Sequence, residues 1–421
     1  MTSELKKRIT DINIGIIPEG YKKTKVGIVP VEWEMCHFKK MFERLKRKNT
    51  ENNTNVLTIS AQYGLINQEE FFNKSVASED KSNYYLLYKG DFAYNKSYSN
   101  GYPFGAIKAL EKYDKGVVSP LYICFSPTDQ NKCPEYYLQY FEDGLMNREI
   151  QAVAQEGARN HGLLNIGIDD FFNSYLVVPS LPEQQKIAEI LSTQDKLIEL
   201  KQNLIEQKKQ KKKWLMQNLL TGKIRLKGFD GEWKKYEVGN CGEITTGSTP
   251  PTKEIENYGD EFVWVTPSDI DDKVFISSSA RLLSKIGMNK SRKLKKGTVL
   301  VTCIASIGKN AILNCNGSCN QQINAVELND SFNNVFFYYL ICYNEPTIKK
   351  FAGKSATQII SKEKFSNLVF KFPKLEEQTA IAEILSHQDK EIELLEKELE
   401  LQKQKKKALM QLLLTGKVRC K

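Results

Sequence analysis

The sequence predicts an α+β protein in which two mixed α/β domains are separated by two long antiparallel coiled-coil helices, arranged as a pseudo-twofold internal repeat. Three observations predict this fold class. One long stretch occurs twice without a gap, both copies carry a helical heptad pattern, and their charges match only when the two helices run in opposite directions.

The repeated stretch is expected to form one long helix in each copy. Ile187 corresponds to Ile381, which lies 194 positions further along the chain. No Pro or Gly interrupts residues 183–221 or 376–415, and the good helix formers Gln, Glu, Lys, Leu and Ala dominate both segments. Each segment runs into a Thr-Gly pair that suits a C-cap, so we expect each helix to end there.

A heptad stripe predicts that the two helices pair as a coiled coil. The expected interface residues are Ile187, Leu191, Ile198, Ile205 and Leu215 in the first copy and Ile381, Leu385, Ile392, Leu395, Leu399 and Leu409 in the second. Residues 183–200 carry a net charge of −2 and residues 201–220 of +5, whereas residues 376–400 carry −7 and residues 401–414 carry +4. Antiparallel pairing sets each acidic half against a basic half, so we expect an antiparallel two-helix rod between two globular heads.

The composition limits the class of protein. The chain has 421 residues, enough for two or three domains, and its net charge of +10 weakly indicates a polyanionic partner. No apolar run approaches the ~18 residues that span a membrane, and the N-terminus lacks the apolar core of a signal peptide. We therefore expect a cytoplasmic protein without a membrane partner. Nine cysteines without a C-x-x-C pair and three scattered histidines indicate reduced thiols and no metal site.

The repeat divides the chain into four segments. Residues 1–180 are expected to form the first mixed domain, with a polar N-terminal arm, and residues 181–223 the first helix. Residues 224–374 are expected to form the second domain, and residues 375–421 the second helix and a C-terminal tail. The helices are near copies, whereas the domains share only a framework. This contrast is typical of helices that share a partner and of domains that each read something different.

The two domains show the same order of expected elements. Those of the first domain are a strand over 56–60, a strand, turn and strand over 86–94, a β-rich run over 117–125, a helix over 135–141 and a last strand over 171–178. Those of the second domain are a Lys-Gly turn at 296–297, a helix over 335–343 and a last strand over 368–372. The internal repeat therefore includes the heads as well as the helices.

Several motifs resemble those of one protein family. L-x-E-Q-x-x-I-A-E-I-L-S begins at Leu181 and again at Leu375, and L-L-T-G-K-[IV]-R ends both helical segments. G-F-D-G-E-W at 228–233, T-G-S-T-P at 246–250 and N-Q-Q-I-N-A at 320–325 add to the resemblance. Over essentially its whole length, the chain resembles the specificity subunit of a Type I restriction-modification system.

The resemblance implies that each domain is a target recognition domain that reads one half of a split site in double-stranded DNA. The helical rod would set the distance between the half-sites, roughly one helical turn or ~34 Å, and would dock two modification (methyltransferase) subunits. Restriction subunits, which are ATP-driven translocases and nucleases, would join them. This chain would carry no cofactor, because S-adenosylmethionine, ATP and Mg are expected on the partner subunits.

Candidate DNA contacts in the first domain lie in two polar segments. The first segment contributes Lys96, Ser97, Tyr98, Asn100 and Tyr102, and the second contributes Arg159, Asn160 and His161. Amides and cations of this kind can read base edges or hold phosphates. Each segment has a plain alternative, an ordinary hairpin loop for the first and a glycine-flanked connector for the second.

Candidate contacts in the second domain are Thr249, Lys253, Ser306, Lys309, Asn310, Gln321, Gln322, Lys354 and Ser355. Gln321 and Gln322 could equally hold the fold, and Lys253 could be a solvated loop lysine. The lysine runs 208–213 and 403–407 could bind phosphate, but the charge match between the helices explains them without DNA.

Two catalytic motifs are missing from the sequence. There is no Asn/Asp-Pro-Pro-aromatic tetrad for amino methylation, because Pro250 and Pro251 are flanked by threonines. There is no G-x-x-x-x-G-K-[ST] loop, because Ile348 stands where its first glycine would be. These absences argue against a stand-alone DNA-modifying enzyme. A scaffold whose heads bind proteins stays open as an alternative, although the loop clusters of Lys, Arg, Asn and Gln favour DNA.

Overall fold

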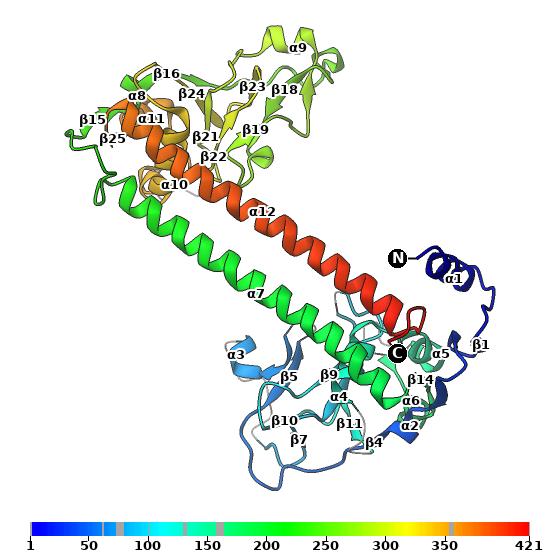
Figure 1. Cartoon of the computed structure of the whole chain (residues 1–421). Helices are drawn as coiled ribbons and strands as arrows, with labels where there is room; N and C mark the ends of the chain where they lie inside the picture. The colour runs from blue at the N-terminus through cyan, green and yellow to red at the C-terminus, as the bar shows by residue number, and fades with distance from the viewer. Residues whose placement is uncertain are drawn as a thin grey trace. The chain divides into compact units, whose positions relative to one another are not determined.

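The computed structural model describes residues 2–60, 63–72, 80–99, 101–128, 133–156, 164–352 and 358–420 (Figure 1). The chain divides into two compact units, of which residues 1–201 with 398–421 form the first and residues 202–397 the second. The two long helices are α7 (Leu181–Leu219) and α12 (Leu375–Leu413), as the repeat predicted. Each unit therefore contains one mixed α/β head and a part of both long helices.

An antiparallel four-stranded sheet forms the centre of the first head. Its strands, in spatial order, are β4 (Phe42–Arg44), β11 (Ile123–Pro127), β8 (Phe92–Asn95) and β9 (Ala106–Ala109). The smaller strand pairs are β1 (Tyr21–Thr24) with β2 (Gly27–Pro30), β3 (Glu34–His37) with β14 (Tyr175–Val178), β5 (Leu57–Ser60) with β6 (Gly64–Asn67), β7 (Tyr85–Tyr88) with β10 (Lys115–Val118), and β12 (Gln155–Glu156) with β13 (Leu164–Asn165). The helices of this head are α1 (Ser3–Asn13), α2 (Phe38–Met41), α3 (Gln68–Phe72), α4 (Pro134–Glu142), α5 (Asn147–Val153) and α6 (Ile168–Asn173).

An aromatic cluster forms the core of the first head. The rings of Phe92 and Phe125 on neighbouring strands are stacked with centroids 5.5 Å apart, and Phe38 meets Phe125 edge-on at 5.0 Å. Ile187 and Leu191 from the first turns of α7 are fully buried in the same core. Burial of such side chains is worth roughly 1.5–3 kcal/mol each, so the start of α7 is fixed to the head.

The second head contains two sheets. The first has the order β16 (Gly242–Thr246), β24 (Ile323–Leu328), β21 (Val299–Thr302), β22 (Asn310–Leu313) and β19 (Phe275–Ile276). The second has the order β17 (Tyr258–Gly259), β20 (Leu282–Leu283), β18 (Phe262–Val265) and β23 (Gly317–Cys319), and β15 (Lys234–Glu237) pairs separately with β25 (Val369–Phe372). The helices are α8 (Val238–Cys241), η1 (Ile255–Asn257), η2 (Pro267–Asp269), α9 (Lys285–Lys290), α10 (Asn334–Phe351) and α11 (Lys362–Ser366).

The two heads share one strand order. β4-β11-β8-β9 of the first corresponds to β16-β24-β21-β22 of the second, and the pair of β3 and β14 corresponds to the pair of β15 and β25. The turns before β8 and β21 also match, because Gly90 has φ +92° and Gly297 has φ +93°. Glycine adopts this left-handed conformation without the steric cost that other residues incur. The prediction of a common framework for the two heads is confirmed.

Polar contacts show the direction of helix pairing within the first unit. Lys406 of α12 lies 2.6 Å from Asp195 of α7. Further along α7, Lys201 lies 2.8 Å from Glu398. Residue numbers fall in one helix as they rise in the other, so the two segments are antiparallel.

The second unit shows the same direction of pairing. Lys208 forms an ion pair with Glu391, and Lys212 forms one with Asp389. Acidic residues of α12 thus face the lysine run of α7, as the charge pattern predicted. Every residue of the predicted coiled-coil interface is buried or half-buried in its own unit.

One aspartate in each copy of the repeat also holds a head. Asp195 accepts a hydrogen bond of 2.8 Å from the Gln139 amide on α4, and Asp389 accepts one of 2.7 Å from the Tyr339 hydroxyl on α10. The two aspartates occupy equivalent positions of the repeat. Each head therefore brings its own donor, an amide or a phenol, to the aspartate at the equivalent position of the repeat.

Two expected elements of the first domain are corrected. The N-terminal arm contains helix α1, which Thr2 caps through a side-chain hydrogen bond to the Leu5 amide, and the hairpin of β1 and β2. The last strand begins at Tyr175 and not at residue 171, because α6 precedes it. Phe171 and Phe172 belong to that helix and are buried in the aromatic core, so their apolar character indicates packing and not a strand.

Candidate nucleic-acid interface

Two motifs of the second head lie side by side at one edge of its five-stranded sheet. Residues 246–250 leave β16, and residues 320–322 lead into β24. Thr246 pairs with Asn324 in the antiparallel register of these two strands, so both segments leave the sheet at the same edge. Thr302, at the end of β21, pairs with Ile323, which brings the loop that follows β21 to this edge as well.

Hydrogen bonds join the two motifs. The Thr246 hydroxyl donates to Asn324 Oδ1 at 2.8 Å, and the Ser248 amide donates to the Cys319 carbonyl at 2.8 Å. The hydroxyl of Thr249 donates to Gln321 Oε1. Both Thr249 and Gln321 are exposed, so a hydroxyl and an amide are presented together to solvent.

Gly247 permits the close approach of these motifs. A Cβ at this position would lie 2.2 Å from the Asn320 carbonyl oxygen and 2.4 Å from that of Cys319. Both obstacles are backbone atoms, which cannot turn aside as a flexible side chain could. The glycine in T-G-S-T-P is therefore required by packing against the N-Q-Q-I-N-A segment.

The two glutamines differ in role. Gln322 is half-buried, and its Oε1 accepts a hydrogen bond of 2.9 Å from the side chain of Asn320. Its carbonyl accepts another of 2.8 Å from the Cys303 amide. Gln322 thus holds the loops together, whereas Gln321 faces solvent.

The loop between β21 and β22 supplies an exposed cation. Lys309 is exposed and Ser306 is half-buried. Asn310, a candidate contact from the sequence, is only 4% exposed and its amide reaches Cys342 Sγ at 3.2 Å. This correction follows from β22, which begins at Asn310 and turns the side chain towards α10. Lys253 is exposed in the segment between β16 and η1.

The loop between β8 and β9 of the first head occupies the equivalent position. Tyr98 is 62% exposed, while Lys96 and Ser97 are half-buried. The Tyr102 amide donates to the Ser99 carbonyl at 2.8 Å, which closes the loop as a short antiparallel bridge. Lys96, Ser97 and Tyr98 therefore stand at the end of β8, where the second head places its loop after β21.

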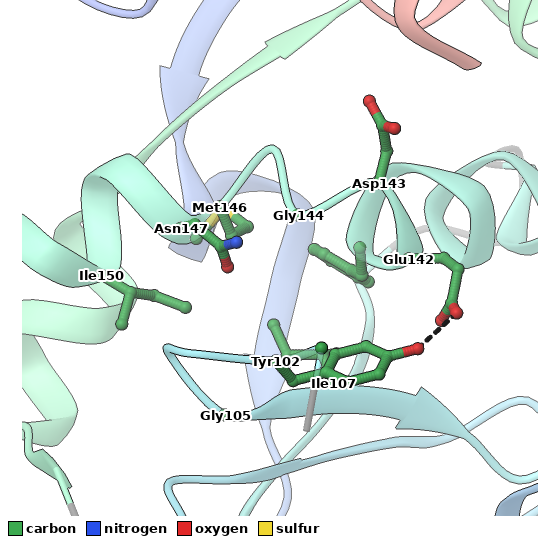
Figure 2. Close-up of a pocket in the computed structure, with 11 residues that line it drawn as sticks. Tyr102, Gly105, Ile107, Glu142, Asp143, Gly144, Met146, Asn147 and Ile150 are labelled. Atoms are coloured by element: carbon green, nitrogen blue, oxygen red, sulfur yellow. Dashed lines mark hydrogen bonds between the residues drawn. The ribbon is translucent and has the colours of Figure 1, made fainter. Parts of the chain in front are cut away.

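Tyr102 anchors this loop to α4. Its hydroxyl donates to Glu142 at 2.5 Å, and Lys108 donates to the same hydroxyl at 3.1 Å and pairs with Glu142. Burial, together with the neighbouring Glu142 carboxylate, raises the pKa of Tyr102, which keeps the phenol protonated as a donor. Figure 2 shows this bond on the wall of a small pocket of about 70 Å³, with Asp143 pointing the other way. Tyr102 is thus a positioning residue of the loop.

Six sequence candidates lie outside the described residues: Asn100, Arg159, Asn160, His161, Lys354 and Ser355. Described residues just beyond two of these segments, residue 164 in the first head and residue 358 in the second, do reach the interface. Leu164 donates to the Lys96 carbonyl at 3.0 Å in the first head, and Ala305 donates to the Gln358 carbonyl at 3.2 Å in the second. Each segment thus returns beside the loop that its own head presents.

Sequence reasoning missed a basic stretch of the first head. Arg44 and Lys46 lie at the end of β4, which corresponds to the position of T-G-S-T-P in the second head, and both are exposed. Arg47, in contrast, forms an ion pair of 2.7 Å with Asp91. The run R-L-K-R-K at 44–48 was the available signal. Its meaning depends on the strand alignment of the two heads, which only the structure provides.

The long helices present apolar side chains away from their seam. Ile190 is 40% exposed and Leu200 57% in the first unit, and Trp214 is 54% and Leu394 57% exposed in the second. In the second unit a shallow groove is lined by Lys211, Leu215, Glu383, Ile384, His387 and Gln388. These side chains are apolar surface that the two long helices leave accessible to solvent.

The model of one protein family, the Type I restriction modification DNA specificity domain, matches residues 30–210 and 230–403. The chain belongs to this family. The two matched ranges lie within the two copies of the internal repeat, and each covers a head and most of the long helix that follows it. This membership supports the DNA-specificity interpretation over the protein scaffold.

Individual members of the specificity family show the same relationship. The chain is 26% identical over 425 residues to the putative type I restriction enzyme MjaX specificity subunit of Methanocaldococcus jannaschii, with 96% of this chain and 97% of that protein covered. It is 27% identical over 143 residues to the HindI specificity subunit of Haemophilus influenzae, with 32% of this chain and 31% of that protein covered.

Solved structures show that the fold is shared. The chain aligns with TM-score 0.59 and 16% identity to a chain from a study of complex assembly and conformational transition of the type I R-M system, covering 93% of this chain and 99% of that one. It aligns with TM-score 0.54 and 15% identity to the type I S subunit of M. genitalium, covering 90% and 96%. The likeness to these two structures concerns the fold alone.

The described residues offer neither a membrane-spanning helix nor a metal site. No described helix is long and apolar enough to cross a membrane. Within the same part of the chain, no group of three or more His, Cys, Asp or Glu side chains is arranged to hold a metal ion.

Proposed function

We propose that this chain is the DNA-recognition subunit of a Type I restriction-modification complex and that it acts on cytoplasmic DNA without being an enzyme itself. Residues 1–180 and 224–374 are its two target recognition domains, each reading one half of an asymmetric bipartite site. The observation that carries this proposal is that both heads present polar loops at the same end of their equivalent sheets. The family membership of both copies supports it.

The two edges offer different chemistry to DNA. The first head presents the cations Arg44, Lys46 and Lys96 with the aromatic Tyr98, whereas the second presents the neutral pair Thr249 and Gln321 beside Lys309. Cations that hold phosphates position a protein on the duplex, and amides in a groove discriminate bases. Two edges of unlike composition are expected to read unlike half-sites.

The helix pair is the expected docking surface for two modification subunits. Its seam is filled within each unit, yet Ile190, Leu200, Trp214 and Leu394 remain exposed on its outer side. Both units therefore offer exposed apolar side chains of the long helices, and we expect one methyltransferase subunit to dock on each unit. Those subunits would supply S-adenosylmethionine chemistry, and restriction subunits would supply ATP- and Mg-dependent cleavage.

A methylation map tests the proposal. Genomic DNA is sequenced for modified bases from the source cells with this gene intact and with it deleted. The proposal predicts that one gapped, asymmetric motif loses methylation on deletion. If no motif changes, the purified chain is tested against a pool of duplex DNA, and the absence of salt-sensitive binding there would refute DNA recognition.

A further inference from the structure

We propose that Arg292 is a DNA-binding residue of the second head, which takes a phosphate group or the paired acceptors of a guanine edge. The proposal rests on the function proposed above and adds a residue that no motif of the sequence indicates. Arg292 lies between α9 and β21, outside both T-G-S-T-P and N-Q-Q-I-N-A.

The backbone of Arg292 is fixed between the two motifs. Its amide donates to the Ser248 hydroxyl at 3.1 Å, and its carbonyl accepts a hydrogen bond of 2.8 Å from the Ser318 hydroxyl. Two residues further on, Leu294 bridges to Gly317 at the start of β23. Because this bridge is antiparallel, Arg292 lies level with the end of β23, where residues 320–322 begin.

Ser248 is itself held firmly, so the position of Arg292 is precise. The Ser248 amide donates to the Cys319 carbonyl at 2.8 Å, and the Ser248 carbonyl accepts a hydrogen bond of 3.0 Å from the indole N–H of Trp264. Trp264 is only 4% exposed. A buried aromatic anchor thus supports the loop that carries the arginine, as a preorganised contact requires.

The guanidinium is exposed and keeps its charge uncompensated. One of its nitrogens donates to the Thr246 carbonyl, and no carboxylate of the described residues forms an ion pair with it. Most of the five N–H donors of Arg292 therefore remain for a ligand.

The chemistry of the neighbouring side chains fits DNA. Arginine binds phosphate and the O6 and N7 acceptors of guanine in a bidentate manner. The exposed Thr249 and Gln321 pair stands on the same edge, so a cation, a hydroxyl and an amide are presented together. Such a set combines a backbone contact with groups that can discriminate bases.

A purely structural role for Arg292 is the competing explanation, since its side chain also binds the Thr246 carbonyl. Arg292→Gln separates the two roles, because glutamine keeps an N–H donor for that carbonyl but removes the charge. Lys296→Ala is the matched control. It removes the same charge from an exposed lysine in the turn before β21, at the opposite end of the sheet.

The experiment uses the purified full chain. Wild type, Arg292→Gln and Lys296→Ala are each used to select duplexes from a random-sequence pool, and their affinities for the selected duplex are measured across NaCl concentrations. A guanine contact predicts that the glutamine variant loses preference at one position of one half-site by roughly tenfold. A phosphate contact predicts weaker binding to all sequences and a salt slope smaller by about 0.9.

The outcomes separate this proposal from the one on which it rests. Arg292→Gln with the motif, affinity and salt slope of the wild type would overturn the role of Arg292 while DNA recognition stands. A change in the bases selected at the other half-site, or an equal effect of Lys296→Ala, would also overturn the role of Arg292. If the wild type selects no motif, DNA recognition itself fails and this residue-level inference falls with it.

Discussion

Arg419 donates two hydrogen bonds, of 2.7 and 2.9 Å, to the carboxylate of Glu183 in the first turn of α7. The equivalent pair of the second unit has the same geometry, because Arg225 donates to Glu377 at 2.7 and 2.8 Å. Glu183 also accepts a hydrogen bond of 2.9 Å from the indole N–H of Trp33. Each unit thus joins the segment that follows one long helix to the first turn of the other through a bidentate arginine.

Removing this arginine is predicted to destabilise one unit at a time. Arg419→Ala removes the cation that pairs with the buried Glu183 carboxylate. We expect this change to lower the free energy of unfolding of the first unit by about 3 kcal/mol. Arg225→Ala should act in the same way on the second. Hydrogen exchange resolved by segment measures both effects. Lys417→Ala, which removes a single surface contact to Asn13, is the control and should change little. If either variant lost protection equally in both units, the assignment of one arginine to each unit would be wrong.

The Glu183 pair also predicts a pH dependence. Burial opposes ionisation of Glu183, but hydrogen bonds from Arg419 and Trp33 outweigh it and hold the pKa of the carboxyl below its usual value. A group with a lowered folded pKa contributes stability above its unfolded pKa and loses that contribution as the pH falls through the folded pKa. Stability of the first unit should therefore decline below about pH 4.5, and Glu183→Gln should flatten this decline. A wild-type acid profile in that variant would refute the assignment.

Asp143 is predicted to act in the opposite direction. Burial raises the pKa of this carboxyl to about 6, although Lys407 and Lys406 oppose the shift. Because the folded protein then holds a proton that the unfolded chain releases, stability falls as the pH rises from about 4 to 6. Asp143→Asn should raise the Tm of the first unit by about 2 °C or more at pH 7 and not at pH 4. An equal gain at both pH values would point to a cause other than ionisation.

Gly247 provides a test of the second interface. Gly247→Ala drives a Cβ into two backbone carbonyls, so we predict a cost of roughly 1–3 kcal/mol and weaker recognition of one half-site only. Gly231→Ala is the matched control, because its Cβ would meet only Lys374 Cε, at 3.8 Å. Thermal unfolding and the methylated motif measure the two effects. If Gly247→Ala changed neither, close contact between the two motifs would not matter for recognition.

The seam and the outer face of the helix pair should respond differently to charge. Leu395→Asp with Leu399→Asp places carboxylates in half-buried seam positions, so it should lower both the Tm and the binding of modification subunits. Leu394→Asp, at a side chain that is 57% exposed, should keep the Tm and weaken docking alone. Circular dichroism with co-purification of the methyltransferase subunit separates the two. Normal docking by both variants would exclude the helix pair as the docking surface.

Local patterns were enough to predict the long helices and their direction. The heptad positions and segment charges lie within each copy of the repeat, and the pairing of Lys212 with Asp389 follows from them. The loops were harder, because their roles depend on contacts between distant segments. Asn310 has the polarity of a ligand-binding residue, yet it begins a strand and is buried against Cys342.

The residues that were missed have the same explanation. Arg44 and Lys46 acquire meaning only when β4 is aligned with β16, and Arg292 only when Ser248 and Ser318 hold it between two motifs. Neither alignment is encoded in a short window of sequence. Asn100 and Arg159 lie outside the described residues and stay predictions.

The composition of the two units has a consequence for protein synthesis. The second unit is continuous, from residue 202 to 397, whereas the first needs both residues 1–201 and residues 398–421. On the ribosome, the head that emerges first must wait for the last segment of the chain, while the later head already has all of its own residues. A premature stop codon near residue 398 would therefore leave the second unit with all of its residues and the first unit without residues 398–421.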